Sequence, residues 1–213
     1  MRNIDPGVYV RREVFEAERE RLFATSWQLL APAARLAERR SYVAVRTERM
    51  MFAANWKVYT DNFVEGLHIP GIHPAFHAAI DFDAFRTTAH DGLVRMTAPP
   101  KEGLWYRGKW LWMWPNWTLS LFRGGMNTSR INPLDEGRTE LIYDFYFDGS
   151  LDEAERERTI QGTLNVVHED FEVCVETQKN YASGAYAPGP LSQRHEMGVA
   201  YFQRKVAEVL GMV

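Results

Sequence analysis

Apolar and polar residues alternate along the middle of the chain, which is the pattern of strands with one buried face. Between 139 and 147, Leu141, Tyr143, Phe145 and Phe147 recur at every second position. Similar short runs predict further strands near 27–31, 42–46, 105–114, 118–122 and 127–132. We expect the strands from 105 to 147 to pair antiparallel in one curved sheet.

A spacing of three and four residues between apolar positions predicts helices around this sheet. They are expected at about 11–23, 55–69 and 152–181, with a last helix near the end of the chain. The long helix at 152–181, in the C-terminal part, is expected to lie across the sheet. This α+β arrangement resembles the helix-grip (START/SRPBCC-like) class, whose cavity between sheet and long helix suits a small ligand.

Two histidines, His68 and His73, stand five positions apart beside Pro70 and Gly71. In a continuous helix, residues five apart point roughly 140° away from each other, so the two imidazoles would not share an ion. Proline and glycine favour a sharp exit from the helix, which would turn both rings towards one point. Glu65 lies one helical turn before His68 and is suited to hydrogen-bond its other ring nitrogen. The alternative is two unrelated histidines near a turn.

Asp170 lies within the apolar stripe of the long helix, between Val167 and Val173. A carboxylate directed at a core is costly unless it is paired or bound to metal. Because a metal held by two histidines commonly takes one carboxylate, we expect Asp170 to be a third ligand. The alternative is a buried aspartate bonded to nearby hydroxyl or amide groups. His168 and Glu169 fall off the stripe and are expected to be solvated neighbours.

Several motifs together resemble one family. Asn55-Trp56-Lys57, followed by Asp61-Asn62-Phe63-x-Glu65-x-x-His68-x4-His73, is similar to the iron-site signature of the Rieske-type non-haem iron oxygenases, the ring-hydroxylating oxygenase alpha subunits. Residues 4–29 are similar to the family's lead-in to its Rieske domain. Residues 111–116 are similar to the strand and turn that follow the iron ligands, and residues 169–178 with 186–192 are similar to the segment that bears the third ligand. The resemblance spans nearly the whole chain.

The resemblance implies an Fe(II) site with His68, His73 and Asp170 as ligands and Glu65 as the acid that bridges to an electron donor. Asn62 falls near the metal-lining asparagine, one residue from the strictest family spacing. The implied activity is that of an oxidoreductase, a monooxygenase or dioxygenase, which hydroxylates or demethylates a small organic substrate with O2. The implied assembly is a trimer or another homo- or hetero-oligomer. Glutamate rather than aspartate at position 65 resembles the branch acting on quaternary ammonium compounds such as choline, betaine or carnitine.

The cysteine content sets this chain apart from the family pattern. A Rieske cluster needs two cysteines and two histidines, and Cys174 is the one cysteine in the sequence. We therefore expect no Rieske cluster in this chain, and a Rieske or ferredoxin partner with its reductase as the electron donor. We divide the chain into residues 1–50, a remnant of the lead-in to the Rieske domain, and residues 51–213, the non-haem iron catalytic domain.

Length and composition fit this reduced organisation, because 213 residues with 46% hydrophobic content are enough for a sizeable core. A formal net charge of −3 provides no basic surface for nucleic acid. We expect no membrane association, since no apolar run is long enough to span a bilayer and the first residues lack a signal peptide's apolar stretch. A single buried cysteine fits a reducing cytoplasm.

Two other functions stay open from the sequence. The chain is alternatively a non-catalytic ligand-binding or assembly subunit that keeps the helix-grip cavity, or a hydrolase that uses another metal. Three tryptophans, Trp110, Trp112 and Trp114, share one strand face. They either pack within the sheet or line an apolar or cation-binding pocket.

Overall fold

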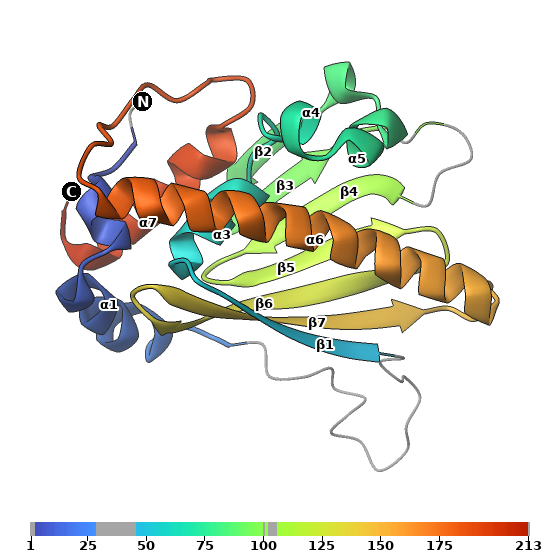
Figure 1. The fold of residues 1–213 in the computed structure, drawn as a ribbon, viewed down its shortest axis with the longest axis horizontal. Coiled ribbons are helices and arrows are strands. Elements are labelled where there is room, and N and C mark those ends of the chain that lie inside the picture. The colour runs from blue at the N-terminus through green and yellow to red at the C-terminus, as the bar shows by residue number, and fades with distance from the viewer. Residues whose placement is uncertain (1–2, 29–45, 100, 102–105, 213) are drawn as a thin grey trace, which may run out of the picture.

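An antiparallel sheet with a long helix across one face forms the body of the molecule (Figure 1). The computed structural model describes residues 3–28, 46–99, 101 and 106–212. Within that part, seven strands follow the order β1-β7-β6-β5-β4-β3-β2. From β2 to β7 each strand pairs with the next one along the chain, and β1 joins the far edge beside β7. The expected α+β class with a long helix across the sheet is confirmed.

The strands are β1 (Arg46–Phe52), β2 (Arg86–His90), β3 (Leu93–Thr97), β4 (Tyr106–Met113), β5 (Trp117–Phe122), β6 (Gly125–Asp135) and β7 (Arg138–Phe147). The strands expected between 105 and 147 are confirmed as β4 to β7. The strand expected near 27–31 is wrong at Trp27 and Gln28, which lie in no strand, and its remainder lies outside the described residues. The strand expected near 42–46 is described only at Arg46, which begins β1.

The hairpin of β2 and β3 was not expected. Its turn is Asp91-Gly92, with φ values of 49° and 79°. Two successive positive φ values match the right-handed twist of a two-residue hairpin, and an Asp-Gly pair adopts them readily. This dipeptide was the sequence signal for the hairpin.

The helices are α1 (Arg12–Glu18), α3 (Trp56–Phe63), α4 (Ile69–Ile72), α5 (Pro74–Ala79), α6 (Glu153–Ala182) and α7 (Met197–Leu210), with a π-helical turn over Arg19–Phe23 and 3-10 turns over Pro6–Tyr9 and Phe82–Ala84. The helices expected at 11–23, at 152–181 and near the end of the chain are found close to those positions, whereas α4 and α5 lie where a loop was expected. A capping box fixes the start of α6, because Asp152 and Glu155 each accept from the other's backbone amide. None of the described helices is long and apolar enough to cross a membrane.

The helix expected at 55–69 ends at Phe63 instead. The chain then turns through Gly66, where a Cβ atom would lie 2.8 Å from the ring of Phe85. Pro70 lies in the first turn of the separate helix α4, a position that needs no backbone donor. The expectation that Pro70 and Gly71 end the helix was therefore wrong, since the bend comes before His68.

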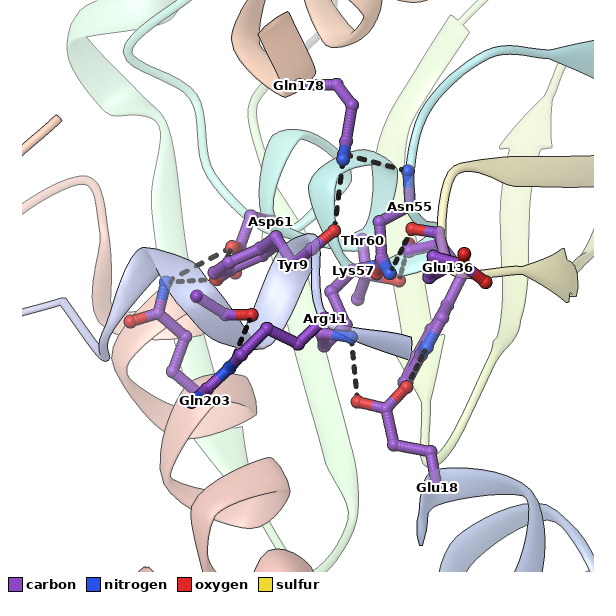
Figure 2. Close-up of polar contacts among 12 residues, drawn as sticks. Tyr9, Arg11, Glu18, Asn55, Lys57, Thr60, Asp61, Glu136, Gln178 and Gln203 are labelled. Atoms are coloured by element: carbon purple, nitrogen blue, oxygen red, sulfur yellow. Dashed lines mark hydrogen bonds and ion pairs between the residues drawn. The ribbon is translucent and has the colours of Figure 1, made fainter. Parts of the chain in front are cut away.

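A buried polar network ties the N-terminal segment to the rest of the fold (Figure 2). Tyr9 donates to Asp61 Oδ2 at 2.5 Å, and Gln203 of α7 donates to the same oxygen at 3.1 Å. In a second group, Lys57 Nζ lies 2.7 Å from Glu18 Oε1, and both side chains are fully buried. Because Lys57 and Asp61 both belong to α3, the network fixes the helix that leads into the histidine segment.

Strand β1 runs across the boundary at which we divided the chain, between residues 50 and 51. It pairs with β7 from Arg46↔Phe145 to Phe52↔Thr139. The strand thus belongs to the sheet on both sides of this boundary, and the division into two regions stays a prediction.

Candidate metal centre

Three side chains from two distant parts of the chain converge on one point. His68, His73 and Asp170 each offer a ligand atom, and these atoms all lie within 4.8 Å of one another. Asp170 Oδ1 is 2.9 Å from His73 Nε2 and 3.6 Å from His68 Nε2. The two imidazole rings are nearly perpendicular, with centroids 5.0 Å apart. The structure thus brings the three predicted ligands together.

The short helix α4 explains how residues five apart face the same point. His68 is its N-cap and His73 its C-cap, so one histidine enters the helical turn and the other leaves it. His73 also precedes α5, whose first residue is Pro74. Two helix ends therefore fix the backbone on either side of His73.

A carboxylate holds the outer ring nitrogen of each histidine. Glu65 Oε1 is in short contact with His68 Nδ1, as expected from their spacing. Glu169 Oε2 lies 2.6 Å from His73 Nδ1. The expectation that Glu169 is merely solvated was therefore wrong, whereas His168 is indeed exposed. Such contacts orient each ring and leave Nε2 free to coordinate.

Asn62, on the last turn of α3, completes the surroundings of Asp170. Its Nδ2 donates to Asp170 Oδ1 at 2.6 Å. Burial by itself lowers the pKa of His73, but the hydrogen bonds and charges of Asp170 and Glu169 outweigh it, so the pKa lies above its ordinary value. The site is thus acidic around its imidazoles, which favours a cation.

These residues fit a divalent transition metal. Two Nε2 atoms and one carboxylate oxygen form the 2-His-1-carboxylate set found at non-haem Fe(II), which occupies one face of the ion and leaves other positions open. Carboxylates on both Nδ1 atoms supply the outer hydrogen bonds that such histidines usually have. The identity of the metal as Fe(II) and the roles of Glu65 and Asn62 stay predictions.

A largely apolar cavity lies between the sheet and α6, with the three ligands in its wall. Apolar lining comes from Phe63, Phe76, Phe85, Met96, Trp110 and Val167. Trp110 therefore lines the pocket, whereas Trp112 packs against Phe202 of α7, with ring centroids 5.4 Å apart. Sequence reasoning did not single out the polar residues on the sheet side, Ser120, Asn127 and Tyr143.

The model of the ring hydroxylating alpha subunit (catalytic domain) family matches residues 36–212. Over 190 residues the chain is 26% identical to a chloroplastic choline monooxygenase of Arabidopsis thaliana, covering 82% of this chain and 44% of that protein. It is 27% identical over 175 residues to the carnitine monooxygenase oxygenase subunit of Escherichia coli K12, covering 73% of this chain and 47% of that one. The chain thus spans less than half the length of either relative.

Solved structures agree on the fold. The quaternary ammonium Rieske monooxygenase CntA, in complex with an inhibitor, superposes with a TM-score of 0.80 at 17% identity, covering 98% of this chain and 95% of that one. Dicamba monooxygenase bound to dicamba superposes with a TM-score of 0.62 at 15% identity, covering 86% and 62%. With a family model matching residues 36–212, the chain belongs to the ring hydroxylating alpha subunit family, in the part that forms its catalytic domain.

Proposed function

We propose that this chain is a mononuclear non-haem iron oxygenase subunit that hydroxylates or demethylates a small organic substrate with O2. The observation that carries the proposal is the meeting of His68, His73 and Asp170 at the wall of an apolar cavity. Fe(II) held there would supply O2 activation at its remaining coordination positions. The apolar walls of the cavity would hold the substrate beside the ion.

The substrate class we propose is a quaternary ammonium compound. The relatives named above include choline and carnitine monooxygenases. The cavity supports the same class, because the rings of Tyr59, Phe76, Phe85 and Trp110 line it. Aromatic faces attract such cations through their ring quadrupoles. Glu65 and Asp170 add negative charge on the metal side.

The 213 residues of this chain do not supply the ligands of a Rieske cluster, because Cys174 is their one cysteine and is buried. We propose that a Rieske or ferredoxin partner, reduced by its reductase, docks beside Glu65. A second cavity is also lined by Glu65 and His68, together with Thr177, Tyr181 and other residues. The expected assembly, a trimer or another oligomer, and the expected cytoplasmic location also stay predictions.

Metal analysis and oxygen uptake test the proposal. Protein purified without oxygen is expected to bind one Fe(II), and His73→Ala and Asp170→Ala are each expected to lose it. The exposed His168→Ala is the matched control and should keep the iron. The chain alone should show no NAD(P)H-driven oxygen uptake, and a Rieske-bearing partner with its reductase should start it.

The role of Glu65 has its own readout. Glu65→Gln should slow the partner-driven oxygen uptake while iron stays bound, since glutamine cannot carry the carboxylate's charge. Zinc in the site with hydrolytic turnover would instead support the hydrolase alternative. A site that binds no metal would support the non-catalytic subunit and contradict our proposal.

A further inference from the structure

Asn127, a polar side chain in the cavity, has no hydrogen-bond partner among the described residues. Asn127 of β6 is 1% exposed, and neither its Nδ2 nor its Oδ1 has a hydrogen-bond partner in the described structure. Buried carboxamides in folded proteins are nearly always bonded. Because Asn127 lines the cavity that carries the metal ligands, both unpaired atoms are available to a molecule bound there.

The register of the sheet shows why Asn127 faces the cavity. Residues opposite each other in neighbouring strands share a face. Met96, Trp110, Ser120, Asn127 and Phe145 form one such row across β3 to β7. The first four of these line the cavity. Asn127 therefore provides a carboxamide in the middle of the cavity floor.

The next row on the same face behaves differently. Its hydroxyl groups are bonded: Thr118 Oγ1 lies 2.5 Å from Ser129 Oγ, and the Tyr143 hydroxyl is in hydrogen-bond contact with both Ser129 and Tyr59. Trp112 of this row has an unpaired Nε1, but it does not line the cavity. Asn127 lines the cavity, and both of its polar atoms are buried and unpaired among the described residues, which points to a ligand as the missing partner.

The charge of the cavity limits what that ligand can carry. Among the described lining residues there is no lysine or arginine, and the charged groups are the carboxylates of Glu65 and Asp170 with the imidazoles between them. A carboxylate on the ligand would lack a positive partner on the sheet side. A hydroxyl group suits Asn127, since it can accept from Nδ2 and donate to Oδ1.

We propose that Asn127 is a specificity-determining residue of this cavity, which binds an uncharged hydroxyl group of the substrate and selects against a carboxylate in that place. The proposal rests on the proposed function in taking the occupant of the cavity to be the substrate. It narrows the quaternary ammonium class to alcohols.

Four ligands separate the contributions of the hydroxyl and of the positive charge. Choline carries both groups, ethyltrimethylammonium lacks the hydroxyl, glycine betaine has a carboxylate instead, and 3,3-dimethylbutan-1-ol is the uncharged isostere of choline. Binding to the full chain is measured by calorimetry, which needs no turnover. We expect choline to bind about tenfold more tightly than ethyltrimethylammonium, as the loss of one well-made hydrogen bond to a buried group implies. Glycine betaine should bind more weakly than choline.

Asn127→Leu, which keeps the number and branching of the side chain's heavy atoms without its polar groups, should remove this preference for choline and leave the affinity for ethyltrimethylammonium within about twofold. Melting temperatures provide the second readout, with Asn116→Leu as the matched control. Asn116 is also buried, but it donates to Ile131 O at 3.0 Å. Asn116→Leu should therefore lower the melting temperature, and Asn127→Leu should not, because it removes an unpaired group.

An unchanged preference for choline in Asn127→Leu would overturn the proposal, and so would a fall in its melting temperature as large as that of Asn116→Leu. Failure of all four ligands to bind would overturn it as well. If 3,3-dimethylbutan-1-ol binds in an Asn127-dependent way and the cations do not, the role of Asn127 is supported and the quaternary ammonium class is wrong. The iron and oxygen measurements test the proposed activity separately.

Discussion

Asn62 Nδ2 lies 2.6 Å from Asp170 Oδ1, the same oxygen that lies 2.9 Å from His73 Nε2. The carboxylate is thus held between α3 and the segment joining α4 to α5. Two contacts on one oxygen fix the orientation of Asp170 relative to both histidines. We therefore expect Asn62 to be a positioning residue for Asp170.

Asn62→Leu should therefore weaken metal binding without removing a ligand. We expect iron affinity to fall about tenfold, at the lower end of what loss of an outer hydrogen bond costs. Competition with a chromophoric chelator measures it. Asn180→Leu, at an exposed position of α6, is the control. Equal affinities in Asn62→Leu and the unaltered protein would contradict the positioning role.

Glu169→Ala should weaken metal binding by about tenfold to a hundredfold, because His73 loses the carboxylate on Nδ1 that fixes its ring. Nitrogen NMR of the His73 ring checks the cause, since the balance of its two neutral tautomers should change. Glu172→Ala, exposed on the same helix, should change neither the affinity nor the spectrum. A changed affinity with an unchanged His73 spectrum would point to a different cause.

Stability should fall as pH rises through the range in which Asp61 ionises. Burial raises the pKa of this carboxyl from 3.8 to about 7, although Tyr9 and Gln203 donate to it. Between these two pKa values the folded state holds a proton that the unfolded chain has lost. The contribution of Asp61 to the free energy of unfolding is therefore fully present below pH 4 and is lost as pH rises through 7. The loss is at most about 4 kcal/mol, since each pKa unit corresponds to 1.36 kcal/mol.

Denaturant unfolding at pH 5 and pH 8 measures this effect. Asp61→Asn keeps the shape of the side chain without its charge and should reduce the difference in unfolding free energy between the two pH values. Asp83→Asn, at an exposed position, should leave that difference as it is. The same difference in all three proteins would show that Asp61 does not titrate in this range.

The buried pair of Lys57 and Glu18 should be sensitive to the loss of one partner. Lys57→Met leaves the Glu18 carboxylate buried, with Trp56 Nε1, at 2.9 Å, as its one donor among the described residues. We expect about 3 kcal/mol of destabilisation in chemical unfolding, as for other broken buried ion pairs. Lys179→Met, which breaks an exposed pair with Glu176, should cost less than about 1 kcal/mol.

A double variant identifies the cause of that loss. Adding Glu18→Gln to Lys57→Met removes the stranded charge and keeps an acceptor for Trp56. Part of the lost stability should return. If the double variant is less stable than Lys57→Met alone, the loss arises from packing and not from charge.

Signals that depend on nearby residues were sufficient to predict much of the fold and part of the site. The alternation in β7 and the stripe of α6 reflect burial of one face, and Asp170 stood out because it interrupts such a stripe. Glu169 could not be recognised in this way, since its partner His73 lies 96 positions away. Asn127 likewise depends on the register of β5 and β6. Interactions that distant segments create on folding leave no periodic pattern.

The pairing of His73 with Asp170 also has a consequence for folding. The two residues are 97 positions apart, and the loop between them contains strands β2 to β7. An ion bound by both residues would hold the two ends of that loop together. A ligand that binds only the folded chain stabilises the folded state by about 2.7 kcal/mol when its concentration is a hundred times its dissociation constant. The melting temperature should therefore rise with added ferrous ion, and a titration of this kind reads the affinity of the site without substrate, partner or reaction.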